Sequence, residues 1–183
     1  MSEKIDILTS RGKPTGNTAV KPQIHQKGFY HNTAHIWFYD FSGNVLLQQR
    51  SSKKTFYPLL WDVSVAGHVD SGESIRQAAI RETREEIGLL ITENDLRKIG
   101  VFESFRTYDS GYIDNEFHHT FISKTHAKLN NLTPNPDEVE SLKFVSMDEF
   151  ETILDHIGKD NHLVPNNKPY YQFVINHINE SIK

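Results

Sequence analysis

The sequence contains no cysteine among its 183 residues. This absence excludes disulfide bonds, thiolate-bound zinc, iron–sulfur ligation and a cysteine nucleophile. An excess of basic residues is also missing, because 20 Lys and Arg stand against 24 Asp and Glu, for a formal net charge of −4. Such a balance argues against a protein dedicated to binding nucleic-acid polymers.

Long apolar runs are absent as well. No segment approaches the roughly 18 consecutive apolar residues of a membrane span, and residues 1–13 contain no apolar stretch of the signal-peptide type. The hydrophobic fraction is 37%. We therefore expect a soluble, cytoplasmic protein that forms one domain over residues 1–183 and has no membrane partner.

The pattern along the chain predicts an N-terminal extension over about 1–30, a core over about 31–157 and a C-terminal helix over about 169–182. Residues 9–28 are predicted as a loop that includes a hairpin. The order of elements indicates mixed α and β structure rather than a regular alternation. Strands are expected at 35–39, 45–50, 61–66, 98–106, 116–124 and 140–145, with helices at 74–87, 147–157 and 170–182.

The most informative segment is the predicted helix over 74–87. Glu82, Glu85 and Glu86 have the spacing i, i+3, i+4, which stacks three carboxylates on one helix face. Their mutual repulsion is relieved by a hard divalent cation, and Mg²⁺ and Mn²⁺ both prefer oxygen ligands. A cation held there also binds substrate phosphates and makes a water molecule more acidic.

An alternative interpretation is a solvated helix face held by i, i+4 ion pairs, in which Arg81 pairs with Glu85. The glycines favour the metal interpretation. Gly67 ends a predicted strand, Gly72 lies in the following turn, and Gly88 stands where a helix C-cap belongs. A strand, a loop and a helix with acids on its face suit a platform for a diphosphate and a metal ion.

This segment resembles the Nudix box at every fixed position, through Gly67, Glu73, Arg81-Glu82, Glu85-Glu86 and Gly88-Leu89. Thr83 stands where an aliphatic residue is usual. The resemblance implies an α/β fold, the Nudix-type α/β/α sandwich with a mixed sheet, and hydrolysis of a diphosphate linkage. It also implies that Mg²⁺ or Mn²⁺ is held by Glu82, Glu85 and Glu86, with Glu85 or Glu86 acting on the attacking water. Gly67, Glu73, Arg81 and Gly88 then have structural roles, with Glu73 supporting the loop through Arg81.

A second resemblance covers roughly residues 20–150 and points to the type 1 isopentenyl-diphosphate isomerases, which are Nudix-fold proteins. It is carried by His25, His31, Trp37, residues 47–50, residues 61–68 and residues 114–116. In that family three histidines and two carboxylates bind one metal ion, and the matching positions here are His25, His31, His68, Asp114 and Glu116.

The interval from His25 to His31 is one residue shorter than in those isomerases. We therefore assign Glu116 to the metal-binding residues together with the box acids, and we predict a possible second metal site from His31, His68 and Asp114. The histidines His35, His118 and His119 lie on predicted strands and are assigned structural roles.

One departure decides between the two activities. The isomerases place a catalytic cysteine directly before the Gly-His pair of the box, and here that residue is Ala66. A methyl group neither donates nor accepts a proton. The leading hypothesis is therefore a metal-dependent hydrolase, with isomerase-type activity and a non-catalytic nucleotide-binding module as alternatives.

The expected partner is a small-molecule diphosphate such as a nucleoside diphosphate derivative, and a homodimer is left open. Specificity is expected to come from loops outside the box. Aromatic residues in those loops either stack on a substrate or pack within the protein. They are Phe56, Tyr57, Phe105, Tyr108 and Tyr112.

Overall fold

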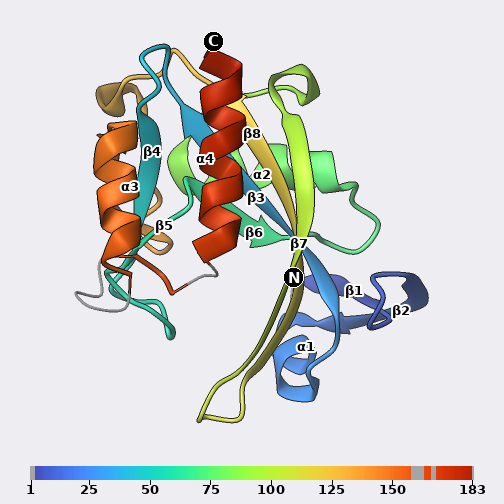
Figure 1. The fold of residues 1–183 in the computed structure, drawn as a ribbon. Coiled ribbons are helices and arrows are strands. Elements are labelled where there is room, and N and C mark those ends of the chain that lie inside the picture. Colours follow the sequence, from blue (N-terminus) through green and yellow to red (C-terminus); the bar gives the residue numbers. More distant parts are fainter. Residues whose placement is uncertain (1–2, 158–162, 166–167, 183) are drawn as a thin grey trace.

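The computed structural model describes residues 3–157, 163–165 and 168–182 (Figure 1). Over this part of the chain, a mixed sheet of seven strands forms the centre of the fold. Its strands are β3 (His31–Tyr39), β4 (Val45–Arg50), β5 (Trp61–Asp62), β6 (Val65–His68), β7 (Arg97–Thr107), β8 (Ile113–Lys124) and β9 (Val139–Val145).

Helices cover both faces of this sheet (Figure 1). Helix α2 (Ile75–Ile87) packs on one face, and α3 (Met147–Asp155) with α4 (Lys168–Ile182) packs on the other. Successive residues of a strand point to opposite faces. On β3, Trp37 therefore packs with α3 and α4, whereas Ile36 packs with α2. The predicted α/β/α sandwich with a mixed sheet is confirmed, since β3 runs parallel to β8 and antiparallel to β4 and β6.

The sheet splits between β3 and β4. These strands are antiparallel and follow one another in the chain, but they pair only at Tyr39 and Val45. Beyond that point β5 pairs with β4, whereas β6 pairs with β3, so the segment from Trp61 to His68 crosses the gap. The Ser64 hydroxyl bridges the two sides, accepting from the Phe38 N–H and donating to the Leu46 carbonyl. The split leaves room for a cavity in the sheet.

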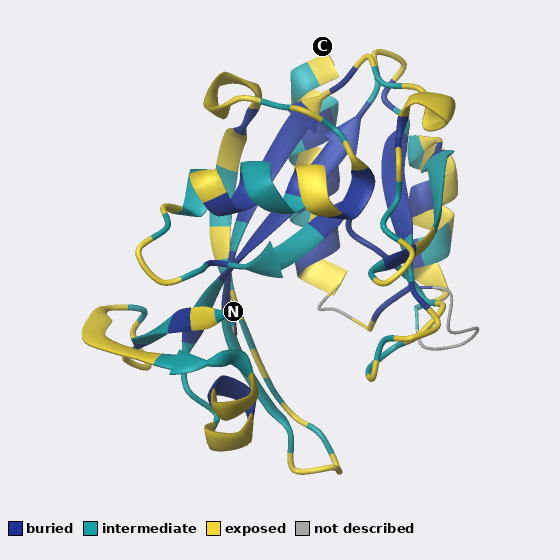
Figure 2. Ribbon diagram, turned by 180° about the vertical axis from the view of Figure 1, so that it is seen from behind, coloured by how far each residue is buried: buried dark blue, intermediate teal, exposed yellow. Residues whose placement is uncertain are grey.

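The N-terminal extension forms a separate lobe beside the sheet (Figures 1 and 2). Its hairpin consists of β1 (Lys4–Leu8) and β2 (Pro14–Val20), as the sequence predicted in part. The prediction of loop structure up to residue 28 is wrong for Lys21–Lys27, which forms helix α1. Proline near its start and Gly28 at its end, with φ 64°, delimit this short helix.

Most predicted elements are found with shifted ends. Helix α2 begins at Ile75, α3 ends at Asp155, and α4 begins at Lys168. The sheet centre is buried, while the outer faces of α2 and the tip of the β7–β8 hairpin are more exposed (Figure 2). Among the described residues, no helix is long and apolar enough to cross a membrane. The fold thus places α2, β6 and the ends of β3 and β8 around the split in the sheet.

Candidate active site

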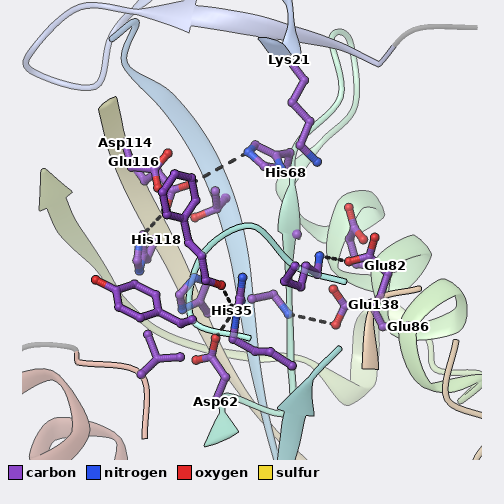
Figure 3. A pocket seen from close by; sticks show the side chains of 18 of the residues that line it. Lys21, His35, Asp62, His68, Glu82, Glu86, Asp114, Glu116, His118 and Glu138 are labelled. Atoms are coloured by element: carbon purple, nitrogen blue, oxygen red, sulfur yellow. Dashed lines mark hydrogen bonds and ion pairs between the residues drawn. The ribbon is translucent and has the colours of Figure 1, made fainter. Parts of the chain in front are cut away.

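A cavity of about 610 Å³ opens at the split in the sheet. Two groups of side chains line it (Figure 3). The first, here called the box acids, consists of Glu82, Glu85 and Glu86 on α2. The second, here called the histidine cluster, consists of His25, His68, Asp114 and Glu116, with the buried His31 behind them, and α1, β3, β6 and β8 supply these residues.

The box acids depend on a well-capped helix. The Ser74 side chain accepts from the backbone N–H of Gln77, and the Gln77 side chain accepts from the Ser74 N–H, which completes a capping box. At the other end Gly88 has φ 71°, a left-handed conformation that glycine adopts without a Cβ penalty. Buried Thr83 satisfies its hydroxyl on the Ala79 carbonyl, so the departure from an aliphatic residue is accommodated.

Glu86 points inward from α2 and is only 4% exposed. Gln48 of β4 donates to Glu86 Oε2 over 3.1 Å, and the backbone N–H of Ala66 donates to the same oxygen over 3.4 Å. Burial raises the pKa of Glu86 well above its usual range, and the charge of Glu82 raises it further. A carboxylate in this setting favours gaining either a proton or a cation.

Glu82 lies directly against Gly67. A Cβ atom added at Gly67 would stand 2.0 Å from the Glu82 carboxyl carbon, so any larger residue there would displace this carboxylate. Burial raises the pKa of Glu82 to about 6, although the Arg81 guanidinium opposes that shift. The position of the Glu82 carboxylate therefore depends on the absence of a side chain at Gly67.

Arg81 forms ion pairs with the three acidic side chains nearest to it, those of Glu73, Glu82 and Glu85. Its guanidinium donates to Glu73, to Glu82 over 2.8 Å, to Glu85 over 3.1 Å and to the His68 carbonyl over 2.9 Å. The structure thus brings together Glu73 and Arg81 as the sequence predicted. The Arg81–Glu85 pair of the alternative interpretation also forms, and Glu85 is the most exposed of the three box acids.

The histidine cluster is compact. The rings of His25, His31 and His68 have centroids 5.1–5.3 Å apart, and each ring offers a nitrogen within 4.8 Å of the others. Asp114 Oδ1 lies 2.6 Å from His25 Nδ1, and Glu116 Oε1 lies 3.4 Å from His31 Nε2 and 3.9 Å from His68 Nε2.

Several polar atoms in this cluster are buried, and although some lie close to a carboxylate of the cluster, none makes a hydrogen bond of regular geometry within the described residues. They are His25 Nδ1 and Nε2, His31 Nε2, His68 Nε2 and Asp114 Oδ1. Buried polar atoms almost always make regular hydrogen bonds, so a convergent set that lacks them calls for an explanation. Imidazole nitrogens with carboxylate oxygens are suitable ligands for a transition metal such as Mn²⁺ or Zn²⁺.

Electrostatics within the cluster keep Glu116 and His68 in their metal-binding forms. Although burial opposes ionisation, the hydrogen bond with His118 and the nearby His31 ring hold the pKa of Glu116 well below its usual range. Burial lowers the pKa of His68 well below its usual range, and the charge of Lys21 acts in the same direction. An ionised carboxylate and a neutral imidazole are the forms that bind metal.

Some sequence assignments need adjustment. Glu116, which was grouped with the box acids, contacts His31, His68 and His118 and so belongs to the histidine cluster. His25, which the predicted second site omitted, is part of this cluster despite its shorter interval, because α1 lies against β8.

Two histidines that were assigned structural roles also line the cavity, namely His35 and His118. A signal for His118 exists in the sequence. Asp114, Glu116 and His118 alternate along a strand and must share one face. His119, by contrast, lies on the opposite face, between Lys98 and Asn32.

Basic and aromatic side chains complete the cavity lining. The basic ones are Lys21, Arg50, Lys54, Arg81 and Arg106. Phe56 packs against Tyr108 and Tyr112, with ring centroids 4.1 and 4.7 Å away, and Tyr112 stacks on His25 at 4.4 Å. Tyr57 also lines the cavity. Phe105 instead packs against Tyr30 and Phe117.

This fold with a complete set of box acids at its split sheet defines a Nudix-type protein. The NUDIX domain family model matches residues 29–166, and the chain belongs to this family. It is 34% identical over 156 residues to Nudix hydrolase 3 of Arabidopsis thaliana, covering 83% of this chain but only 20% of that much longer relative.

Other relatives carry a different name. The chain is 32% identical over 145 residues to an isopentenyl-diphosphate Delta-isomerase of Nocardia farcinica, covering 77% of this chain and 78% of that one. A crystal structure from Deinococcus radiodurans shares the fold with a TM-score of 0.69 over 97% of this chain and 98% of that chain, at 19% identity. The predicted membership of an isomerase-like branch of the Nudix superfamily is confirmed.

Proposed function

We propose that this protein is a hydrolase, dependent on Mg²⁺ or Mn²⁺, that cleaves a diphosphate linkage in a nucleoside diphosphate derivative or a related compound. The observation that carries the proposal is the burial of Glu86 and the partial burial of Glu82 beside β6, in a cavity that also holds basic side chains. Buried carboxylates with raised pKa values are typical of functional sites.

The box acids supply oxygen ligands for the cation. Glu82, Glu85 and Glu86 share one helix face, and Gly67 and Arg81 fix the position of Glu82. A divalent cation bound there would neutralise diphosphate charge and make a coordinated water more acidic. The basic side chains at the cavity wall, including Lys54 and Arg50, would bind the remaining phosphate oxygens.

Glu86 is the proposed base. Its carboxylate is buried, and Gln48 holds one of its oxygens, so it keeps a fixed orientation towards the cavity. A carboxylate whose pKa is raised by burial accepts a proton from water more readily than a solvated one. Glu85 is exposed and forms an ion pair with Arg81, so we assign it as a metal ligand rather than as the base that takes a proton from water.

The histidine cluster favours a second candidate, isomerisation of a prenyl diphosphate. Its three imidazoles and two carboxylates match the ligand set of the isomerases that the sequence resembles. Ala66 weighs against this candidate, because its methyl group cannot transfer a proton. We therefore propose that the cluster holds a second metal ion that supports hydrolysis.

The test is a panel of nucleoside di- and triphosphates, sugar nucleotides and prenyl diphosphates, each assayed with Mg²⁺ and with Mn²⁺. Wild type should release phosphate or a phosphate ester from at least one compound, and Glu86→Gln should be slower by about 100-fold or more. Equal background rates for both proteins would overturn the proposal. Conversion of isopentenyl to dimethylallyl diphosphate would support the isomerase instead, and nucleotide binding without turnover would support the binding module.

A further inference from the structure

His35 occupies a position in the cavity that the box acids and the histidine cluster leave unexplained. It is 6% exposed, it lines the cavity, and it is labelled in Figure 3. In the β3–β6 ladder His35 pairs directly with Ala66, so both side chains lie on the same face of the sheet. Since Ala66 ends in a methyl group, the space beside the His35 ring stays open.

Buried hydrogen bonds through the Tyr170 hydroxyl hold the His35 ring in place. The indole nitrogen of Trp37 lies 2.9 Å from the Tyr170 hydroxyl, and His35 Nδ1 lies 3.0 Å from the same hydroxyl. An indole N–H can only donate, so the Tyr170 oxygen accepts from Trp37. The same hydroxyl also hydrogen-bonds Thr120. When Trp37 and Thr120 both donate to the Tyr170 oxygen, its own proton goes to His35 Nδ1, which makes Nδ1 the acceptor.

This arrangement leaves the ring proton of a neutral His35 on Nε2. Burial lowers the pKa of His35 well below its usual range, and the adjacent His118, whose ring centroid is 3.9 Å away, acts in the same direction. The ring is therefore neutral near pH 7. Because the two nitrogens of an imidazole diverge, the Nε2–H group points away from Tyr170.

Ala66 connects this donor to the proposed active site. Its side chain lies beside His35, while its backbone N–H contacts Glu86 Oε2 over 3.4 Å. A substrate over Ala66 is thus within range of both groups. We propose that His35 is a fixed, neutral hydrogen-bond donor, with Nδ1 held by Tyr170 and the Nε2–H group donating to an oxygen of the diphosphate substrate.

This assignment rests on the proposed function for its substrate, but its first test does not require turnover. Long-range ¹⁵N–¹H correlation spectra of histidine-labelled protein report which ring nitrogen carries the proton. The His35 signals are assigned by their loss in His35→Gln. We expect Nε2–H in wild type and a mixture of tautomers in Tyr170→Phe. An Nδ1–H tautomer or an imidazolium at pH 7 in wild type would overturn the proposal.

Binding is probed with methylenediphosphonate and Mg²⁺, because this analogue resists cleavage. The His35 Nε2–H resonance should shift on saturation, and the exposed ring of His126 serves as the internal control. No shift of His35 under conditions in which the analogue binds would contradict the proposal. This measurement stands even if no diphosphate in the panel is hydrolysed.

The third test compares kcat/KM among variants of His35. The amide of Gln reaches about as far as Nε2, whereas that of Asn falls short. With a cleavable substrate, His35→Asn and His35→Leu should lose about 10- to 100-fold in kcat/KM, as for a hydrogen bond to a charged group, and His35→Gln should lose clearly less. If His35→Leu retains full activity while Glu86→Gln is inactive, the role of His35 is wrong and the hydrolase proposal stands. If His35→Leu does not fold, the spectra of wild type and Tyr170→Phe decide.

Discussion

Gln48 of β4 donates a hydrogen bond from Nε2 to Oε2 of Glu86 on α2, across 3.1 Å. Both side chains are only 4% exposed, and Gln48 Oε1 makes no hydrogen bond among the described residues. The contact joins the sheet to the deepest box acid. It gives the carboxylate one orientation that burial alone would not specify.

Removing this donor should reduce activity without dismantling the fold. Gln48→Met keeps a side chain of similar length but loses the N–H group, so kcat should fall about tenfold or more, as for a hydrogen bond to a charged group. Gln49→Met is the matched control, because Gln49 donates to the Leu59 carbonyl away from α2. Steady-state rates of both variants check this. Equal rates for both would show that Glu86 needs no positioning by Gln48.

Gly67→Ala should weaken metal binding. The new Cβ would stand 2.0 Å from the Glu82 carboxyl carbon, so the carboxylate must move. We expect the Mg²⁺ concentration for half-maximal activity to rise at least tenfold, by analogy with disturbed ligand positions at other metal sites. Gly100→Ala is the control, since its Cβ would meet the rings of Phe102, at 3.1 Å, and Phe173, at 3.7 Å, and no box acid. An unchanged Mg²⁺ dependence in Gly67→Ala would contradict the packing argument.

The histidine cluster should bind a metal ion independently of the box acids. His25→Asn removes one of three convergent imidazoles and should lower the affinity for Mn²⁺ or Zn²⁺ about 10- to 100-fold. Metal analysis after dialysis measures this, with the exposed His126→Asn as control. Identical metal content in wild type, His25→Asn and His126→Asn would show that the ring nitrogens of the histidine cluster hold no ion.

His119 should make the metal-free protein less stable in acid. Partial burial lowers its pKa to about 4, and the Lys98 ammonium, 3.0 Å from Nδ1, acts in the same direction. An unfolded histidine titrates near 6.5, so the unfolded state binds more protons between about pH 4 and 6.5. Stability from this residue is therefore present above pH 6.5 and is lost as the pH falls towards 4.

The check is the melting temperature in EDTA as a function of pH. Lys98→Met removes the repelling charge and should raise the pKa of His119, so Tm should fall less between pH 7 and pH 4.5 than in wild type. Other titrating groups are common to both proteins and cancel in the comparison. A steeper fall in Lys98→Met would reverse the assigned sign.

Local signals explain what the sequence could predict. Helix α2 was found because its apolar period, its cap residues and its box spacing all lie within one segment. The reason for Gly67 was not available, because it depends on the Glu82 side chain across the loop. Helix α1 was missed because seven residues with a proline give a weak helical signal. His25 was named as a matching position but left out of the predicted second site because of its shorter interval to His31, and its place in the cluster depends on tertiary packing.

The sequence also did not indicate that His35 and His118 line the cavity, and the reason is different. Each lies in a strand whose alternation with His31 or Glu116 places it on the cavity face. The sequence does not reveal where the sheet splits, and only the split turns that face into a cavity wall. Residue spacing identified the box acids and most of the histidine cluster, whereas the full set of residues that line the cavity required the strand order.

The most direct test of the central claim is hydrolysis in ¹⁸O-labelled water, with product analysis by mass spectrometry. If a metal-supported water attacks phosphorus, wild type with Mg²⁺ or Mn²⁺ should place one ¹⁸O atom in a phosphate-containing product of an active diphosphate. Glu86→Gln should incorporate almost none in the same time. Products without label at phosphorus, or equal labelling by wild type and Glu86→Gln, would contradict the account.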